Sequence, residues 1–250
     1  MVNAVAVIPA RYGSTRLPGK ALADIAGVPM IVRVWQQTRK ARLLERVLIA
    51  TDDERIGSAV RNAGGDVEMT ASSHPSGTDR ITEVACRVPA EIYLNVQGDQ
   101  PFIAPEDIDG VVSTMTAEPS LSMATLGAPI VDLEEWRNPN KVKIVCDRQG
   151  YALYFSRSPI PFFRDGAGVP RGALRHVAVY GYRRDFLLRF GTLAPGDLEQ
   201  IEKLEQLRAM EHGYRIKVIG SNAPSLEVDT PEDLALANLH AAEWRITGRD

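Results

Sequence analysis

Short apolar runs alternate with helical patterns over the first half of the chain, and this alternation restricts the possible folds more than any other feature. Val5–Ile8, Val47–Thr51 and Ile92–Val96 are short and rich in apolar residues, which favours buried strands. Between them, apolar residues recur at intervals of three and four, as on one face of a helix. The pattern predicts an α/β fold with a mostly parallel, twisted sheet and helices on both faces.

Turn and capping residues predict where the helices begin and end. Helices are expected after Pro29, from Asp53 to about Ala63, from about Asp79 to Arg87, after Pro105, from Asp197 to Gly213, and from Thr230 onwards. In the fifth of these, Asp197 can act as the cap, and Leu198 and Ile201 begin an apolar stripe. The last one starts with a threonine cap, a proline at the first helical position and two acids.

The pattern changes after about Met123, where strand-like runs follow one another without a long helical period. These runs are Met123–Ala128, Val142–Cys146, Tyr151–Ser156 and His176–Tyr182. We therefore expect an antiparallel strand arm, residues 123–190, within a single domain of residues 1–250. A further strand is expected at Arg215–Ile219.

Composition excludes several classes of function. The 250 residues carry a formal net charge of −3 at pH 7, and no block of basic residues suggests a nucleic-acid partner. No apolar run reaches the ~18 residues of a membrane span. Cys86 and Cys146 lack metal-ligand spacing, and no apolar signal segment of the usual length opens the chain. We expect a cytoplasmic protein.

The first strand leads into a loop that is suited to binding an anion. It offers backbone and charged donors, namely Gly13, Ser14, Thr15 and Gly19 together with Arg11, Arg16 and Lys20. A P-loop is excluded, because Gly13 and Gly19 are one residue too far apart and Ala21 replaces the magnesium-binding hydroxyl. A basic surface loop without a ligand is the alternative. A nucleoside triphosphate is the ligand we expect.

Two aspartates follow extended runs elsewhere in the chain. Asp99 lies in a turn after Ile92–Val96, and Asp229 lies just before the last helix. Each has a purely structural explanation as a turn or helix-preceding residue. Together with the basic loop they favour a Mg²⁺ site, because Mg²⁺ prefers one or two carboxylates plus phosphate oxygens and waters. In such sheets, loops that follow strands face one crevice.

Several segments, in fixed order, resemble the sugar-activating cytidylyltransferases. The matching segments are Arg11–Lys20, Ser76–Arg80, Gln97–Pro101, Tyr151–Arg157, Leu174–His176, Tyr180–Arg183, Glu202–Arg208 and Val228–Asp233. The resemblance implies a nucleotide-diphospho-sugar transferase-like fold and a homodimer formed through the arm. It is greatest to the members that activate 3-deoxy-manno-octulosonate (Kdo), which implies transfer of CMP from CTP to Kdo for lipopolysaccharide biosynthesis.

The resemblance also implies roles for individual residues. Lys20 and Arg11 would neutralise phosphate charge, with Mg²⁺ on Asp99 and Asp229. The nucleotide-binding set would be Pro9, Ala10, Arg11, Ser14, Thr15, Arg16, Lys20, Ser76, Gly77, Thr78 and Arg80. The sugar-binding set would be Gln97, Arg157, His176, Tyr180 and Glu205. An arginine suits an acidic sugar, because its planar guanidinium can bind a carboxylate with two hydrogen bonds.

The sequence departs from the family pattern at a few positions. Gln100 and Asp79 each stand where the family usually has glutamate, and Phe162 and Phe163 replace a pattern with tryptophan. These departures leave two alternatives open. One is another acid sugar, 8-amino-Kdo or a sialic acid, and the other is a non-catalytic nucleotide-binding regulator.

Overall fold

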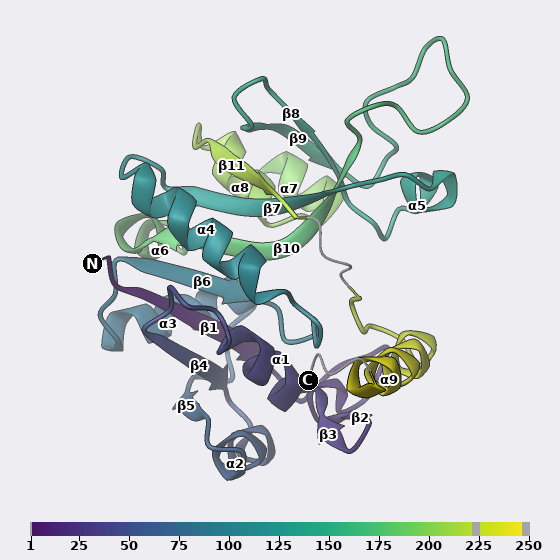
Figure 1. The fold of residues 1–250 in the computed structure, drawn as a ribbon. Helices are drawn as coiled ribbons and strands as arrows, with labels where there is room; N and C mark the ends of the chain where they lie inside the picture. The colour runs from purple at the N-terminus through teal and green to yellow at the C-terminus, as the bar shows by residue number, and fades with distance from the viewer. Residues whose placement is uncertain (1, 222–225, 247–250) are drawn as a thin grey trace. The chain divides into compact units, whose positions relative to one another are not determined.

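The computed structural model describes residues 2–221 and 226–246, with side chains up to residue 243. The chain divides into two compact units, residues 1–109 with 224–250, and residues 110–223. Figure 1 labels the elements of each unit. The single domain expected over residues 1–250 remains a prediction. No helix in the described part of the chain is long and apolar enough to cross a membrane.

The first unit is built on a parallel sheet, as the alternating pattern predicts. Its strands are β1 (Ala4–Ala10), β4 (Arg46–Thr51), β5 (Asp66–Met69) and β6 (Ile92–Val96). Strand β1 pairs in parallel with both β4 and β6, and β5 extends the sheet beyond β4. The side chains of Val5–Ile8 are 0–1% exposed, because helices cover both faces of this central strand.

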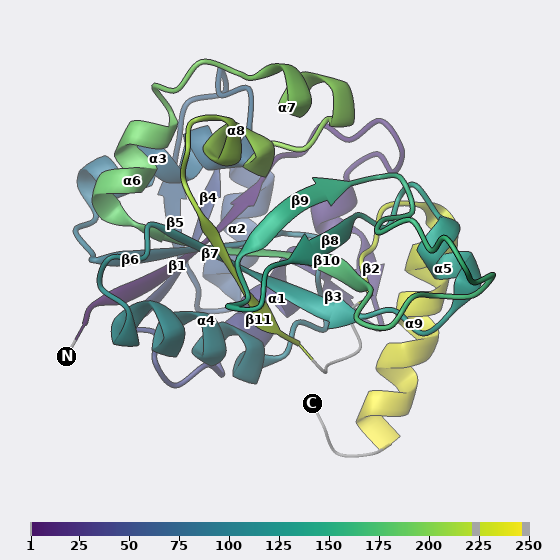
Figure 2. The same cartoon turned by 90° about the horizontal axis from the view of Figure 1, so that it is seen from above.

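Helices and a small hairpin complete the first unit. They are the 3₁₀ turn Lys20–Leu22, the hairpin β2 (Asp24–Ile25) and β3 (Val28–Pro29), and helices α1 (Met30–Thr38), α2 (Glu54–Asn62), α3 (Gly77–Arg87) and α9 (Pro231–Ile246). Helix α4 (Pro105–Ala117) continues into the second unit. Figures 1 and 2 show α1 and α3 on opposite faces of the sheet.

Local capping determines the helix starts in the first unit. The Asp53 side chain accepts a hydrogen bond from the Arg55 amide, which confirms the predicted cap of α2. At α9, the Asp233 amide donates to Thr230 Oγ1 at 3.2 Å, while Asp233 Oδ2 accepts from the Thr230 amide at 2.9 Å. Helix α3 starts at Gly77, two residues before the expected start, because Ser76 is its cap.

The second unit contains the predicted antiparallel strands. They are β7 (Met123–Pro129), β8 (Lys143–Cys146), β9 (Ala152–Ser156) and β10 (Leu174–Arg183), and β11 (Ile216–Gly220) follows later in the chain. Strand β10 is antiparallel to β7 and β8, and β8 is antiparallel to β9. Strand β11 runs parallel to β7. The short helices α5 (Leu133–Arg137) and α6 (Arg184–Phe190) connect these strands to the rest of the unit.

The prediction of one helix from Asp197 to Gly213 was wrong. Two short helices occupy this stretch, α7 (Asp197–Glu202) and α8 (Gln206–Glu211), and Lys203 between them has a left-handed backbone with φ 54°. Two backbone amides in the first turn of α7 donate to the Glu211 carboxylate, the Leu198 amide at 2.9 Å and the Glu199 amide at 3.2 Å. A distant carboxylate thus replaces the expected Asp197 cap, and Ile201 is left 76% exposed.

Candidate functional site

A cavity of about 370 Å³ in the first unit brings together most of the residues expected to bind a nucleotide. The expected residues that line it are Pro9, Ala10, Arg11, Ser14, Thr15, Arg16, Lys20, Ser76, Gly77, Arg80, Gln97, Asp99 and Asp229. Thr78 does not line this cavity, and its 2% exposed side chain lies in the first turn of α3. The loops that follow β1 and β6 therefore face the same cavity, as predicted.

The two aspartates meet at the Lys20 ammonium group. Lys20 Nζ lies 2.7 Å from Asp99 Oδ2 and 2.7 Å from Asp229 Oδ1. The backbone joins the two loops as well, because the Val228 amide donates to the Asp99 carbonyl at 2.9 Å. Arg16 Nη2 adds a second cation, 3.1 Å from Asp229 Oδ1. One cation can thus be shared by two carboxylates that lie 130 positions apart in the chain.

The electrostatic balance keeps Lys20 charged. Its burial lowers the pKa of the ammonium group, but the charges and hydrogen bonds of Asp99 and Asp229 outweigh this effect and hold the pKa above the ordinary lysine value. The charged form is therefore the stable one at neutral pH. A phosphate group that enters the cavity meets a lysine that is already protonated.

The same two carboxylates suit a magnesium ion that arrives with a nucleotide. Within residues 2–221 and 226–246, no group of three or more histidine, cysteine, aspartate or glutamate side chains is arranged to hold a metal without other ligands. Mg²⁺ accepts a site of one or two carboxylates when phosphate oxygens and waters complete its shell. The donor set of Asp99 and Asp229 fits that requirement.

Two glycines allow the loops to approach closely. Gly19 has a φ of +67°, which L side chains rarely adopt, and it precedes Lys20 directly. A Cβ atom at Gly98 would lie 3.1 Å from the Pro9 carbonyl oxygen, so the loop that carries Asp99 packs on the end of β1. Both positions bring a charged side chain to the cavity.

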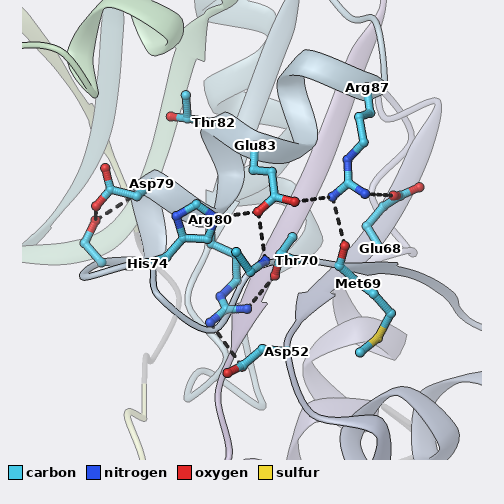
Figure 3. A network of polar contacts seen from close by, with 12 residues as sticks. Asp52, Glu68, Met69, Thr70, His74, Asp79, Arg80, Thr82, Glu83 and Arg87 are labelled. Atoms are coloured by element: carbon cyan, nitrogen blue, oxygen red, sulfur yellow. Dashed lines mark hydrogen bonds and ion pairs between the residues drawn. The ribbon is translucent and has the colours of Figure 1, made fainter.

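The cavity wall before α3 is held by a polar network (Figure 3). Arg80 is 5% exposed, and its guanidinium pairs with Asp52 at 3.1 Å and donates to Thr70 Oγ1. Ser76 Oγ donates to Asp79 at 2.7 Å and accepts from the Asp79 amide. His74 also lines the cavity. We had not assigned His74 to the site, although its position in a polar loop just before a helix was a usable signal.

The second unit contains four of the five residues expected to bind the sugar. His176 on β10 is 9% exposed, and its ring lies edge-on to Phe155. The Thr125 hydroxyl donates to the Val179 carbonyl at 2.8 Å, so the 2.9 Å contact with His176 Nε2 requires the imidazole to donate. Burial, with a smaller contribution from the Arg175 charge, lowers the pKa of His176 to about 3. His176 is therefore neutral at physiological pH.

Arg157 follows β9 and donates to backbone carbonyls. Its guanidinium reaches the Glu202 carbonyl at 2.7 Å, the Pro139 carbonyl at 3.1 Å and the Lys203 carbonyl at 3.4 Å. The Glu202 carboxylate in turn accepts from the Arg157 amide at 2.9 Å. Arg157 thus joins the end of β9 to the break between α7 and α8. Whether it also binds the sugar stays a prediction.

Tyr180 and Glu205 lie near this break too. Tyr180 Oη donates to Gln206 Oε1 at 3.1 Å, and the Glu205 carbonyl accepts from the Arg208 amide at 3.1 Å in the first turn of α8. Gln206 is 3% exposed, and its Nε2 has no hydrogen-bond partner among the residues that the structure describes. Gln206 is not among the expected site residues, and the signal for it was its place in the matching segment Glu202–Arg208.

The fold and the cavity define a nucleotide-binding α/β protein, and comparison with known proteins gives the family. A model of the family described as cytidylyltransferase matches residues 5–216. The 3-deoxy-manno-octulosonate cytidylyltransferase of Geobacter sulfurreducens is 52% identical over 242 residues, which cover 93% of this chain and 97% of that protein. The enzyme of the same name from Syntrophotalea carbinolica is 48% identical, with coverage of 96% and 98%. The chain belongs to the cytidylyltransferase family.

Solved structures agree with this assignment. A CMP:2-keto-3-deoxy-manno-octonic acid synthetase complexed with CTP superposes with a TM-score of 0.90 at 44% identity, covering 96% of this chain and 99% of that chain. A 4-diphosphocytidyl-2C-methyl-D-erythritol synthase from Anaerococcus prevotii has a TM-score of 0.66 at 12% identity, with coverage of 96% and 99%. The second likeness concerns the fold alone. The expected fold class is confirmed.

Proposed function

We propose that this chain transfers CMP from CTP to the anomeric hydroxyl of Kdo, giving CMP-Kdo and pyrophosphate. The observation that carries the proposal is the cavity in which Lys20, Asp99 and Asp229 meet, in a chain about half identical to enzymes named for this reaction. The product would serve lipopolysaccharide biosynthesis.

In this reaction the sugar hydroxyl oxygen forms a bond to the α-phosphorus. The bond from that phosphorus to the bridging oxygen breaks, pyrophosphate leaves and the hydroxyl loses its proton. The protein needs no nucleophile of its own, so its task is to position the substrates and to stabilise negative charge. Lys20, Arg11 and Arg16 are cations that line the cavity and can bind the triphosphate.

We also propose that Asp99 and Asp229 hold Mg²⁺ when the nucleotide is bound. The metal would supply additional neutralisation of phosphate charge. If Mg²⁺ binds both carboxylates, the Lys20 ammonium would exchange one or both of them for phosphate oxygens. The arrangement supports this, because the carboxylates that Lys20 releases are the ones that can accept a cation.

Recognition of the sugar is proposed for five residues. We propose that Gln97, Arg157, His176, Tyr180 and Glu205 contact Kdo, with Arg157 on its carboxylate. Gln97 lines the cavity and donates to Asn95 at 2.9 Å. The other four side chains lie around β10 and the α7–α8 break.

The working form of the enzyme is proposed to be a cytoplasmic homodimer that forms through the arm. Two exposed apolar side chains of the second unit support such an interface, Val131 at 88% and Phe162 at 86% exposure. Light scattering on the purified protein should give twice the mass of one chain. Phe162→Ser should shift the mass toward that of one chain, and a monomeric wild type would rule out the dimer.

A panel assay tests the reaction itself. Pyrophosphate release should be measured with CTP, UTP, ATP and GTP, each combined with Kdo, 8-amino-Kdo and a sialic acid. We expect the highest kcat/KM with CTP and Kdo. A preference for another acid sugar would replace the substrate but keep the reaction, whereas no release with any pair would point to a nucleotide-binding regulator.

A further inference from the structure

Tyr12 lies inside the loop Arg11–Lys20 but is not among the described residues that line the cavity. Arg11, the residue before it, does line the cavity. The Tyr12 ring packs instead on the far end of the same loop, because a Cβ atom at Gly19 would lie 3.3 Å from Tyr12 Oη and 3.4 Å from its Cζ. Gly19 directly precedes Lys20. The ring therefore joins the beginning of the loop to its end.

An arginine of helix α2 covers this ring. The Arg55 guanidinium carbon lies 3.4 Å from the centre of the Tyr12 ring, which is a cation–π contact. The Asp53 carboxylate holds the guanidinium with two hydrogen bonds, from Arg55 Nε at 2.9 Å and from Nη2 at 2.6 Å. The Asp53 side chain also caps α2. Arg55 is thus fixed at the first turn of a helix, and it holds the ring from there.

Asp53 is in turn bonded to the end of a strand. Its amide donates to Thr51 Oγ1 at 3.2 Å, and Thr51 is the last residue of β4 and is fully buried. The hydrogen bonds from Arg55 hold the pKa of Asp53 below its ordinary value, so the pair is ionised at neutral pH. Contacts therefore run from the end of β4 through the Asp53–Arg55 pair to the Tyr12 ring.

The second half of the loop has hydrogen bonds of its own. The Leu17 amide donates to Ser14 Oγ at 3.4 Å, and the Lys20 amide donates to the Leu17 carbonyl at 3.0 Å. These bonds order residues 14–20 relative to one another, but they do not set the position of this segment relative to α2. The Tyr12 ring adds that restraint, because it contacts the end of the loop and the helix together.

We propose that Tyr12, held by Arg55, is a positioning residue of the nucleotide site, which keeps the loop Arg11–Lys20 in the form that binds the triphosphate. The inference rests on the proposed function, because it takes CTP as the ligand. A loop that is already ordered loses less conformational freedom when the nucleotide binds, so its affinity is higher than that of a loose loop. The ion pairs of Lys20 hold the last residue of the loop, and the ring restrains the residues before it.

A first experiment measures the order of the loop in the ligand-free protein. Arg16 is a trypsin site inside the loop with a side chain that is 62% exposed, and cleavage there requires local opening. Mass spectrometry of a limited digest gives the rate of the cut after Arg16. We expect this cut to be about fivefold faster in Tyr12→Leu and in Arg55→Ala, the scale of one cation–π contact. Arg61→Ala is the matched control and should keep the wild-type rate, because Arg61 lies on the same helix and pairs with Glu54 at 2.5 Å. An unchanged rate in Tyr12→Leu or in Arg55→Ala would overturn the inference.

A second experiment measures the nucleotide site. Tyr12→Leu should raise the KM for CTP about tenfold and Arg55→Ala about fivefold, because the loss of the ring removes its contacts with both Arg55 and Gly19. The KM for Kdo and kcat should stay near the wild-type values, since saturating CTP orders the loop in every variant. Tyr12→Phe should behave like the wild type, because it keeps the ring. Damage by Tyr12→Phe equal to that by Tyr12→Leu, or a fall in kcat without a change in the KM for CTP, would contradict the proposal.

A double variant tests whether the two residues act through one contact. If Arg55 acts through the ring, Tyr12→Leu combined with Arg55→Ala should raise the KM for CTP no further than Tyr12→Leu alone. Single effects that multiply in the double variant would show that Arg55 acts by another route and would refute the proposal. Wild-type protein that releases no pyrophosphate from CTP would refute the proposed function instead, and the trypsin rates would still decide whether the ring orders the loop.

Discussion

The two units use a lysine side chain differently. In the first unit, Lys20 donates to the side chains of Asp99 and Asp229. In the second, Lys143 is fully buried and donates to the Asn138 and Lys141 carbonyls at 2.8 and 2.6 Å, and burial, then the charge of Arg157, lowers its pKa. Lys20 can exchange its carboxylate partners for a ligand, because side chains can move. The carbonyl partners of Lys143 belong to the backbone of residues 138–141, so Lys143 holds that loop in place. Substitutions should therefore affect activity in the first unit, and both activity and stability in the second.

The largest effect is expected at the two aspartates. Asp99→Asn and Asp229→Asn should each reduce kcat by at least ~10²-fold, the scale of one lost electrostatic contact in the transition state. EDTA should abolish turnover as well. Initial-rate measurements with a Mg²⁺ titration test this, with the exposed Asp66→Asn as the control. Normal rates in either variant, or in EDTA, would remove the metal assignment.

Lys20 and Lys40 allow a charge in the cavity to be compared with a charge in solvent. Lys20→Ala should lower kcat/KM for CTP strongly, whereas Lys40→Ala should have little effect, because Lys40 is exposed at the end of α1. In the absence of nucleotide, Lys20→Ala should also bind Mn²⁺ more tightly than the wild type, as titration calorimetry can measure. Equal turnover of the two alanine variants would show that the loop Arg11–Lys20 does not bind the triphosphate.

Arg157 tests whether a structural arginine also binds substrate. Arg157→Ala should raise the KM for the sugar by about one to two orders of magnitude, the equivalent of roughly 1.5–3 kcal/mol, and leave CTP affinity nearly unchanged. Arg157→Lys should recover little, because an ammonium group lacks the planar pair of donors. Kinetics should be paired with thermal unfolding, since the contacts to the Glu202 and Lys203 carbonyls are lost too. Weakened CTP binding with normal sugar kinetics would assign Arg157 to the nucleotide.

The smallest effect is a pH dependence of stability in the second unit. The pKa of His176 is about 3 in the folded protein and 6.5 for an ordinary histidine, so the unfolded chain binds the proton first. The contribution of the neutral ring is fully present above pH 6.5 and is lost as the pH falls toward 3. The free energy of unfolding, measured by urea titration, should fall less steeply over this range in His176→Gln. Identical slopes would show that the ring is not buried as a neutral group.

Features that depend on near neighbours were predictable from the sequence. The Asp53 cap and the reciprocal bonds of Thr230 and Asp233 involve residues two or three positions apart, so a local pattern is sufficient. The parallel strands of the first unit were predictable because short β-branched runs and helical periods alternate. The loop Arg11–Lys20 could be located for the same reason, because it is one contiguous segment after a strand.

Contacts between distant residues were decided only by the tertiary structure. Lys20 meets Asp99 and Asp229 across 79 and 209 positions, so no sequence pattern could show that one ammonium group bridges both carboxylates. Glu211 accepts from the Leu198 amide 13 positions away and takes the place of the expected Asp197 cap. The left-handed Lys203 divides a helix that local periodicity predicts to be continuous. Propensities and periodicity describe each segment by itself, whereas packing decides which charged groups come together and which backbone donors are already satisfied.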